Sequence, residues 1–145
     1  MTAFRKKLSL RWADLDPNFH LRHSVYYDFG AEQRVEILET HGLTLKFMQE
    51  NFLGPVLFRE ECIFRREIRL GDEVTITARL AKMKADASRW SIQHEFMRAD
   101  KKLLATLTVD GAWIDTKLRK LAPSMPAIVK EVFEHFPKTD DFALL

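Results

Sequence analysis

Residues 14–23 place several polar side chains that can do chemistry within one short segment. They are Asp14, Asp16, Asn18, His20 and His23. A carboxylate can attack an electrophile or deprotonate water, and an imidazole can orient a substrate or carry a proton. A helix is predicted to follow at once, and the free N–H groups and dipole at a helix N-terminus stabilise negative charge. The segment therefore suits a reaction in which an oxyanion develops.

The helix that positions this segment is predicted to span about Ser24 to His41. Spacings of four, four and three place a group of its apolar residues on one face, namely Tyr27, Ala31, Val35 and Leu38. Ser24 is the predicted N-cap and Gly42 the predicted C-cap. Gly30 lies in mid-helix, where glycine costs about 1 kcal/mol against alanine, so a close approach of backbone or ligand would explain it.

Beyond this helix and a short helical turn within residues 43–55, apolar and polar residues alternate with period two, which is typical of half-buried strands. The alternating segments are residues 4–13, 56–70, 74–80, 90–96 and 103–113. In the first of them, Trp12 falls on the inward face. Gly71-Asp72 is a clear turn sequence. Strands joined by tight turns predict an antiparallel meander with one apolar face, which the long helix would cover.

A second helix is predicted near the C-terminus, with a cap at Ser124 and an apolar side made of Ile128, Val129, Val132, Phe133 and Phe136. Residues 138–145 are expected to be a loose tail. The predicted architecture is an α+β domain over residues 1–136 with a tail at 137–145. A chain of 145 residues, of which 46% are hydrophobic, is long enough for one domain with a sizeable core.

Composition excludes several classes of function. The net charge of +2 gives no case for nucleic acid or an anionic membrane surface. Cys62 is the single cysteine, so no internal disulfide is possible and a reducing compartment fits. The N-terminus lacks the apolar core of a signal peptide, and no apolar run approaches the roughly 18 residues that span a bilayer. We therefore expect a cytoplasmic protein that neither binds nucleic acid nor inserts into a membrane.

The loop and the order of the predicted elements resemble the hotdog-fold acyl-CoA thioesterases of the 4-hydroxybenzoyl-CoA thioesterase family. The resemblance covers roughly residues 8–125 and rests on Asp-x-Asp-Pro at 14–17 and on His23-x-x-Tyr26 before the helix. It implies an antiparallel sheet of five or six strands wrapped around one long central helix. It also implies a homodimer or homotetramer whose sheets pair edge to edge. We expect no cofactor and no metal.

The same resemblance implies roles for the polar segment. In that family the second Asp of the motif, here Asp16, is the nucleophile or the base toward water. A backbone N–H at the start of the helix polarises the thioester carbonyl, and the matching position is His23. Another branch of the family carries Asp-x-x-x-His-x-Asn, whose His matches His20. The implied activity is hydrolysis of a thioester of CoA or acyl carrier protein. The catalytic candidates are Asp16 and His23, and the substrate-binding candidates are Asn18, His20 and Tyr26.

Two other functions stay open at the level of sequence. Residues 16–20 read Asp-Pro-Asn-Phe-His, which is close to Asp-x-Asn-Pro-x-His, the motif of hotdog-fold enoyl-thioester hydratases. A non-catalytic acyl-thioester binding protein is the third interpretation, because the histidines mix two branches of the family. Ala31 also stands where some members carry a helix Glu.

Several polar residues have a purely structural interpretation. Asp16 before Pro17 is a common way to start a turn. His94 lies on an apolar strand face and is predicted to be a hydrogen-bonded core histidine. The alternating charges of residues 59–69 are predicted to form a solvated face.

Other catalytic chemistries find little support in the sequence. No Gly-x-Ser-x-Gly elbow or Ser-His-Asp set is present, which disfavours a serine hydrolase. Two histidines alone are weak grounds for a metal site. Candidates for contact with a CoA phosphate, which the sequence alone does not rank, are Arg65, Arg66 and Arg89.

Overall fold

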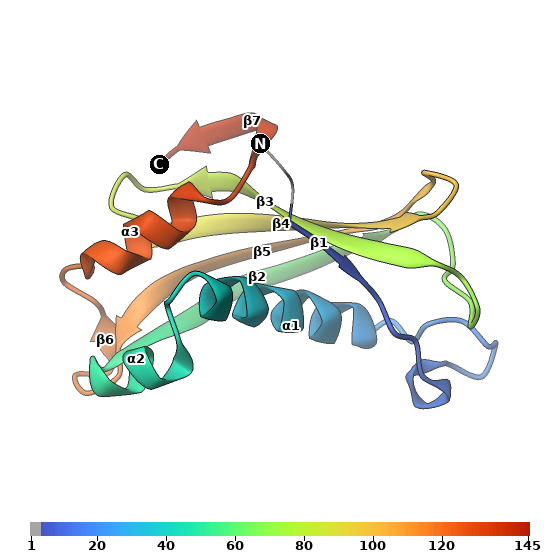
Figure 1. Cartoon of the computed structure of the whole chain (residues 1–145), viewed down its shortest axis with the longest axis horizontal. Helices are drawn as coiled ribbons and strands as arrows, with labels where there is room; N and C mark the ends of the chain where they lie inside the picture. Colours follow the sequence, from blue (N-terminus) through green and yellow to red (C-terminus); the bar gives the residue numbers. More distant parts are fainter. Residues whose placement is uncertain (1–3) are drawn as a thin grey trace.

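The structure is a computed structural model and describes residues 4–145. Its main feature is one curled sheet of seven strands, with a long helix lying along it (Figure 1). Five strands follow the order β1-β3-β4-β5-β2, while β6 pairs with β5 and β7 pairs with β3. The strands are β1 Phe4–Lys7, β2 Leu53–Phe64, β3 Val74–Met83, β4 Arg89–Arg98, β5 Leu103–Asp115, β6 Lys120–Leu121 and β7 Lys138–Leu144. The expected α+β architecture is confirmed, with more strands than the five or six expected.

The long helix α1 (Val25–Thr40) contacts β2, β3 and β5, as predicted for the cover of the sheet. It ends before Gly42, whose φ of +93° lies in the left-handed region that favours glycine. A Cβ on Gly30 would lie 2.5 Å from Cδ2 of Leu107 on β5. Gly30 therefore lets helix and sheet approach closely, which confirms the interpretation of this mid-helix glycine.

The buried face of α1 differs from the predicted one. The buried residues are Val25, Tyr26, Gly30, Gln33, Arg34, Ile37 and Leu38. Of the predicted face only Leu38 is buried, whereas Ala31 and Val35 are exposed. The prediction is wrong because it used apolar residues alone, whereas the polar residues Gln33 and Arg34 are buried. The true buried face is therefore turned around the helix axis relative to the predicted one.

Gln33 and Arg34 enter the core because His94 on β4 gives them partners. His94 is fully buried, and its Nδ1 lies 2.8 Å from Oε1 of Gln33 and 3.2 Å from the Thr77 carbonyl oxygen. Its Nε2 lies 3.0 Å from Nη1 of Arg34. Arginine can only donate, so Nε2 accepts and Nδ1 carries the proton. The prediction of a hydrogen-bonded core histidine is confirmed.

This buried imidazole makes stability sensitive to acid. Burial, helped by the neighbouring Arg34 charge, lowers the pKa of His94 from 6.5 to about 3. Between these values the unfolded chain binds a proton that the folded chain does not, so stability falls as the pH drops, by up to about 1.4 kcal/mol per pH unit. We expect urea unfolding to show about 2 kcal/mol less stability at pH 5 than at pH 7. His94→Gln should remove most of that difference, and an equal difference in the variant would contradict the assignment.

The first strand is shorter than the alternation predicts. β1 ends at Lys7, and the chain then forms a 3-10 turn over Trp12–Asp14. The buried Asp14 carboxylate accepts from the backbone N–H of Arg11 at 3.1 Å and from its guanidinium at 2.8 Å. This capped turn replaces the last residues of the predicted strand. Trp12 is consequently 68% exposed, and its predicted inward position is wrong.

The sheet order corrects one predicted hairpin. Gly71 does form a turn, with a φ of +96°, but the strand before it, β2, ends at Phe64. The backbone N–H groups of Arg65 and Arg66 both donate to the Leu104 carbonyl, at 2.9 and 3.0 Å, where the chain leaves the ladder. β2 pairs antiparallel with β5 and forms an outer edge of the sheet, whereas β3, β4 and β5 form the predicted meander.

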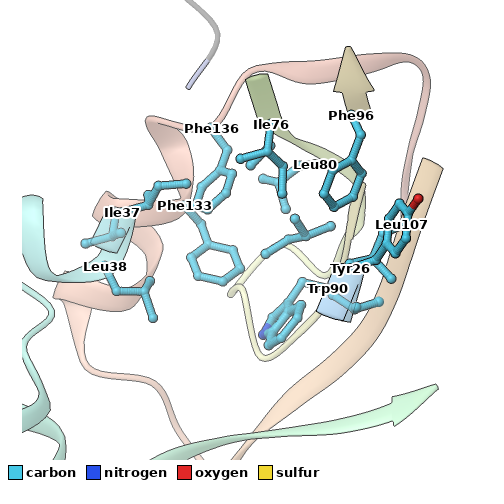
Figure 2. Close-up of a cluster of buried hydrophobic side chains, with 14 of the residues drawn as sticks. Tyr26, Ile37, Leu38, Ile76, Leu80, Trp90, Phe96, Leu107, Phe133 and Phe136 are labelled. Carbon is cyan, nitrogen blue, oxygen red and sulfur yellow. The ribbon is translucent and has the colours of Figure 1, made fainter. Parts of the chain in front are cut away.

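Two shorter helices complete the fold. α2 (Leu45–Glu50) is the expected helical turn, and α3 (Ala127–Glu134) has the expected apolar side. Figure 2 shows Phe133 and Phe136 meeting Ile37 and Leu38 of α1 in the core. α3 begins after Pro126, so the cap predicted at Ser124 is wrong. No helix among residues 4–145 is long and apolar enough to cross a membrane.

The C-terminal segment is a strand and not the loose tail that we expected. β1 pairs only with residues 75–78 of β3, which leaves the rest of that edge without a neighbour. β7 fills it by pairing in parallel with β3, and the Leu80 N–H donates to the Pro137 carbonyl at 2.8 Å. An unpaired edge exposes backbone donors and acceptors, so this pairing explains the order of the segment.

Candidate active site

The loop before α1 is fixed against the residues that follow β2. Leu21 and Ile68 are both buried, and the Leu21 N–H donates to the Ile68 carbonyl at 2.7 Å. His20 forms a single β-bridge with Arg69. Between these segments lies a cavity of about 320 Å³, here called the Asp16 cavity. It is lined by Asp16, His20, Leu21, His23, Tyr26, Phe64, Arg65, Arg66 and Glu67.

The cavity gathers most of the predicted site residues. Those that line it are Asp16, His20, His23 and Tyr26. Asn18 does not line it, although its backbone N–H contacts Asp16. Of the opposite wall, residues 64–67, the sequence named Arg65 and Arg66 as candidates for contact with a CoA phosphate, whereas Phe64 and Glu67 were missed because this stretch was assigned to a strand with a solvated face. The adjacent arginines Arg65-Arg66, which interrupt the alternation at a strand end, are the feature that marks this wall in the sequence.

Asp16 is held through one of its two carboxylate oxygens. Oδ1 accepts from the backbone N–H of His20 at 3.1 Å and from that of Asn18 at 2.8 Å. The bond from His20 and then that from Asn18 lower the pKa of Asp16, so the carboxylate is ionised at neutral pH. Oδ2 has no hydrogen-bond partner within the described range. Asp16 thus starts a turn and still keeps one oxygen without a protein donor.

The turn around Asp16 contains a strained residue. Phe19 has a φ of +64°, in the left-handed region that a bulky side chain rarely adopts. Its N–H donates to the Asp16 carbonyl at 3.0 Å, and its ring lies 5.8 Å from that of Trp12. Such strain persists only where surrounding contacts hold it, and it concentrates at functional sites. Four other turns of the chain, at Phe52, Ala87, Lys101 and Arg119, also have a positive φ, so the strain at Phe19 does not by itself mark a site.

The two histidines of the loop have different surroundings. His20 is oriented by a carboxylate of the opposite wall, since its Nε2 lies 3.0 Å from Oε2 of Glu67. His23 is exposed, and its backbone N–H has no acceptor in the part of the chain that the structure describes. Ser24 occupies the N-cap position, but its hydroxyl accepts from Nε of Arg22 at 3.0 Å and does not cap the helix. The N-terminus of α1 is therefore left open to a group that carries negative charge.

Tyr26 forms the apolar back of the cavity. Its ring packs edge-on against Phe64, with centroids 4.9 Å apart, and against Phe96, at 5.2 Å. Burial raises the pKa of the Tyr26 phenol to about 12, so it is neutral at physiological pH. Figure 2 shows this ring beside Phe96 and Leu107 in the core.

The arginines considered for a CoA phosphate are separated by the fold. Arg65 and Arg66 are exposed on the wall of the Asp16 cavity. Arg89 lies elsewhere, with its guanidinium carbon 5.3 Å from the centroid of the Phe58 ring. The sequence alone did not rank these three arginines. The structure places Arg65 and Arg66, but not Arg89, on the wall of the Asp16 cavity.

A comparison with known protein families identifies the relationship of this chain. The model of the thioesterase-like superfamily matches residues 10–133, which include the loop, α1 and the meander. The chain belongs to the thioesterase-like superfamily. This membership confirms the expected relationship and the assignment to the thioester hydrolases. A search of curated protein sequences finds no match.

Solved structures show the same hotdog fold at low sequence identity. A hypothetical protein from Staphylococcus aureus in complex with CoA has a TM-score of 0.85 at 18% identity, covering 95% of this chain and 88% of that one. A 1,4-dihydroxy-2-naphthoyl-CoA thioesterase from Synechocystis has a TM-score of 0.80 at 19% identity, covering 92% and 97%. A DHNA-CoA thioesterase from Staphylococcus aureus has a TM-score of 0.75 at 15% identity, covering 84% and 80%.

Proposed function

We propose that this chain hydrolyses acyl-CoA thioesters in the Asp16 cavity. The observation that carries the proposal is an ionised carboxylate with one free oxygen, in the same cavity as an uncapped helix N-terminus. The CoA complex and the naphthoyl-CoA thioesterase among the structural neighbours support CoA as the carrier. Superfamily membership supports the thioester as the bond that is cleaved.

In the proposed reaction the thioester carbonyl lies at the N-terminus of α1, where the His23 N–H stabilises the oxyanion. The Asp16 carboxylate attacks the carbonyl carbon or removes a proton from an attacking water. If Asp16 attacks, the C–S bond breaks as an acyl-Asp16 anhydride forms, CoA leaves as the thiolate and takes a proton from solvent, and water then hydrolyses the anhydride to release the acid and restore the carboxylate. If Asp16 acts as base, water adds to the carbonyl carbon, and the proton that Asp16 removed passes to the CoA sulfur as the C–S bond breaks, which releases the acid and the thiol. His20, oriented by Glu67, positions water or substrate, and Tyr26 bounds the acyl group.

Release of free thiol from a panel of acyl-CoAs tests this function. The panel needs short, medium, long and aromatic acyl groups, because the cavity wall combines aromatic and charged residues. Thiol release by the wild-type chain is the expected result and ranks the substrates. Hydration of crotonyl-CoA without thiol release would support the hydratase instead, and binding without either reaction would support the acyl-thioester binding protein.

Arg65 and Arg66 are proposed to contact the phosphates of CoA. Replacing both by alanine should raise KM for acyl-CoA about tenfold, since charge-assisted bonds of this kind contribute on the order of 1–3 kcal/mol. The effect on kcat should be small because the CoA phosphates lie far along the CoA chain from the thioester bond that breaks. Steady-state thiol release measures both constants. Arg89→Ala, which removes an arginine away from the cavity, should leave KM unchanged, and an equal rise in KM there would contradict the assignment.

We also propose that the chain forms a homodimer or homotetramer through the outer edge of β2. This edge carries several exposed apolar side chains, namely Leu57, Phe58, Ile63 and Phe64. Phe64 also lines the Asp16 cavity, so pairing of two such edges would bring a second copy to the site. Sedimentation equilibrium at micromolar concentration tests the proposal, and the mass of a single chain would reject it.

A further inference from the structure

A second cavity, of about 230 Å³, lies beside the C-terminal half of α1, between that helix, the sheet and α3. Its walls are mainly apolar and include Leu38, Leu57, Trp90, Ile92, Trp113 and Phe133. Figure 2 shows three of these side chains, Leu38, Trp90 and Phe133, gathered in one region of the core. Arg34 is its one charged lining residue, and we call it the Arg34 cavity.

The two cavities are distinct. They share no lining residue among residues 4–145. Tyr26 of the first cavity and Ala31 of the second lie on the same helix, five positions apart, which corresponds to about 7.5 Å of helix rise. The residues that would hold a ligand in the Arg34 cavity are therefore different from those of the Asp16 cavity.

Arg34 is a buried charge without a counter-ion. Only 9% of the residue is exposed, and it forms no ion pair with a carboxylate within the described part of the chain. Among residues 4–145, the one hydrogen bond of its side chain goes to the neutral ring of His94, at 3.0 Å. Burial lowers the pKa of Arg34 to about 10, and the charge of Glu60 offsets this only in part. The guanidinium is therefore still charged at neutral pH, where an uncompensated buried charge is costly.

The neighbouring aromatic residues add donors and no acceptors. The indole Nε1 atoms of Trp90 and Trp113 are buried without a hydrogen-bond partner among residues 4–145. A tryptophan indole N–H can donate a hydrogen bond but cannot accept one, and the same holds for an arginine guanidinium. Buried polar groups normally have partners, and groups without one call for an explanation. The polar groups that border this apolar cavity, namely the Arg34 guanidinium and the two indole N–H groups, are thus all donors, and a negatively charged acceptor would complement them.

We propose that the Arg34 cavity binds a small apolar monocarboxylate. The carboxylate pairs with the Arg34 guanidinium, whose planar fork suits bidentate bonds to two oxygens. The hydrocarbon part fills the space between the tryptophan rings and Phe133. An apolar cavity of about 150 Å³ holds benzene, so about 230 Å³ admits a larger group such as a short acyl chain or a substituted ring.

The test uses the tryptophans of the cavity as reporters. Trp12 is the one tryptophan outside it and is largely exposed, so Trp12→Phe leaves Trp90 and Trp113 as the fluorophores. Octanoate titrated into this variant should change the fluorescence saturably. It should bind at least tenfold more tightly than 1-octanol, which has the same chain and no charge. Equal binding of the two ligands, or no saturable change with octanoate, would overturn the proposal.

Matched arginine variants locate the site. In the Trp12→Phe background, Arg34→Met should weaken octanoate binding at least tenfold, whereas Arg66→Met, on the wall of the Asp16 cavity, should leave it unchanged. An unchanged affinity in Arg34→Met, or a larger loss in Arg66→Met, would overturn the proposal. The comparison of octanoate with octanol needs no change at Arg34, so it decides the matter even if Arg34→Met does not fold.

Discussion

Asp16→Asn should lower thiol release from acyl-CoA by about 100- to 10,000-fold, the usual contribution of a positioned carboxylate base or nucleophile. Asparagine keeps the Oδ1 atom that accepts from the backbone N–H groups of His20 and Asn18, so the turn is preserved. It removes only the charge and the nucleophilic oxygen. Comparison of kcat/KM for the two chains measures the loss, and an unchanged thermal midpoint shows that the fold is intact.

A matched carboxylate separates this effect from a general change of charge. Asp28 lies in the first turn of α1, close to the loop in sequence, but it does not line the Asp16 cavity. Asp28→Asn should retain the activity of the wild type. Activity of Asp16→Asn within threefold of wild type would reduce Asp16 to a turn former, the structural interpretation that its bonds to the backbone also allow.

The strands of the meander were predictable because one face of this sheet is buried and the other is not. In β4 the alternation of Trp90, Ile92, His94 and Phe96 with polar residues marks the buried face, and all four are buried in the structure. A side chain that alternates between core and solvent leaves a period of two in the sequence. In β2 both faces are partly exposed, so the alternation is a weaker guide to where the strand ends. The alternating pattern continues to residue 70, whereas the strand ends at Phe64.

The buried face of α1 was not predictable from periodicity, because its polar members depend on a partner on another element. Gln33 and Arg34 both contact the buried His94, about sixty residues later, and Gln33 also donates to the Ile76 carbonyl. Nothing local to the helix encodes that partnership. The same holds for β7, whose place is set by the part of the β3 edge that β1 leaves open.

The candidate site likewise combines residues that local sequence predicts with residues that only tertiary contacts bring in. Asp16, His20, His23 and Tyr26 lie within one short segment, so their spacing and the following helix were enough to propose them together. The facing wall at residues 64–67 joins them through tertiary contacts, namely the pairing of β2 with β5, the hydrogen bond from Leu21 to Ile68 and the bridge from His20 to Arg69. Local spacing therefore identified the loop, and the tertiary contacts placed the candidate arginines Arg65 and Arg66 opposite it and added Glu67.

Gly111→Ala should lower the free energy of unfolding by about 3 kcal/mol. This is the upper end of the usual cost of inserting an extra methyl group into a close-packed interior. Gly111 lies in β5, where a Cβ would fall 2.4 Å from Cη2 and 2.7 Å from Cζ2 of the Trp90 ring, and 2.7 Å from the Val56 carbonyl oxygen. Trp90 is buried and packs against Phe133, with centroids 5.9 Å apart, and the Val56 oxygen belongs to the backbone of β2. Neither can move aside cheaply.

Gly54→Ala is the matched control, since Gly54 lies on the same β2–β5 ladder. A Cβ there would meet only the Thr116 Cγ2 atom at 3.1 Å and Ile114 Cγ1 at 3.9 Å, so the loss should stay below about 1 kcal/mol. Urea unfolding at neutral pH compares the two variants. Similar small losses would mean that the Trp90 ring shifts readily. In that case the Arg34 cavity would lack a fixed wall, because the same ring bounds it.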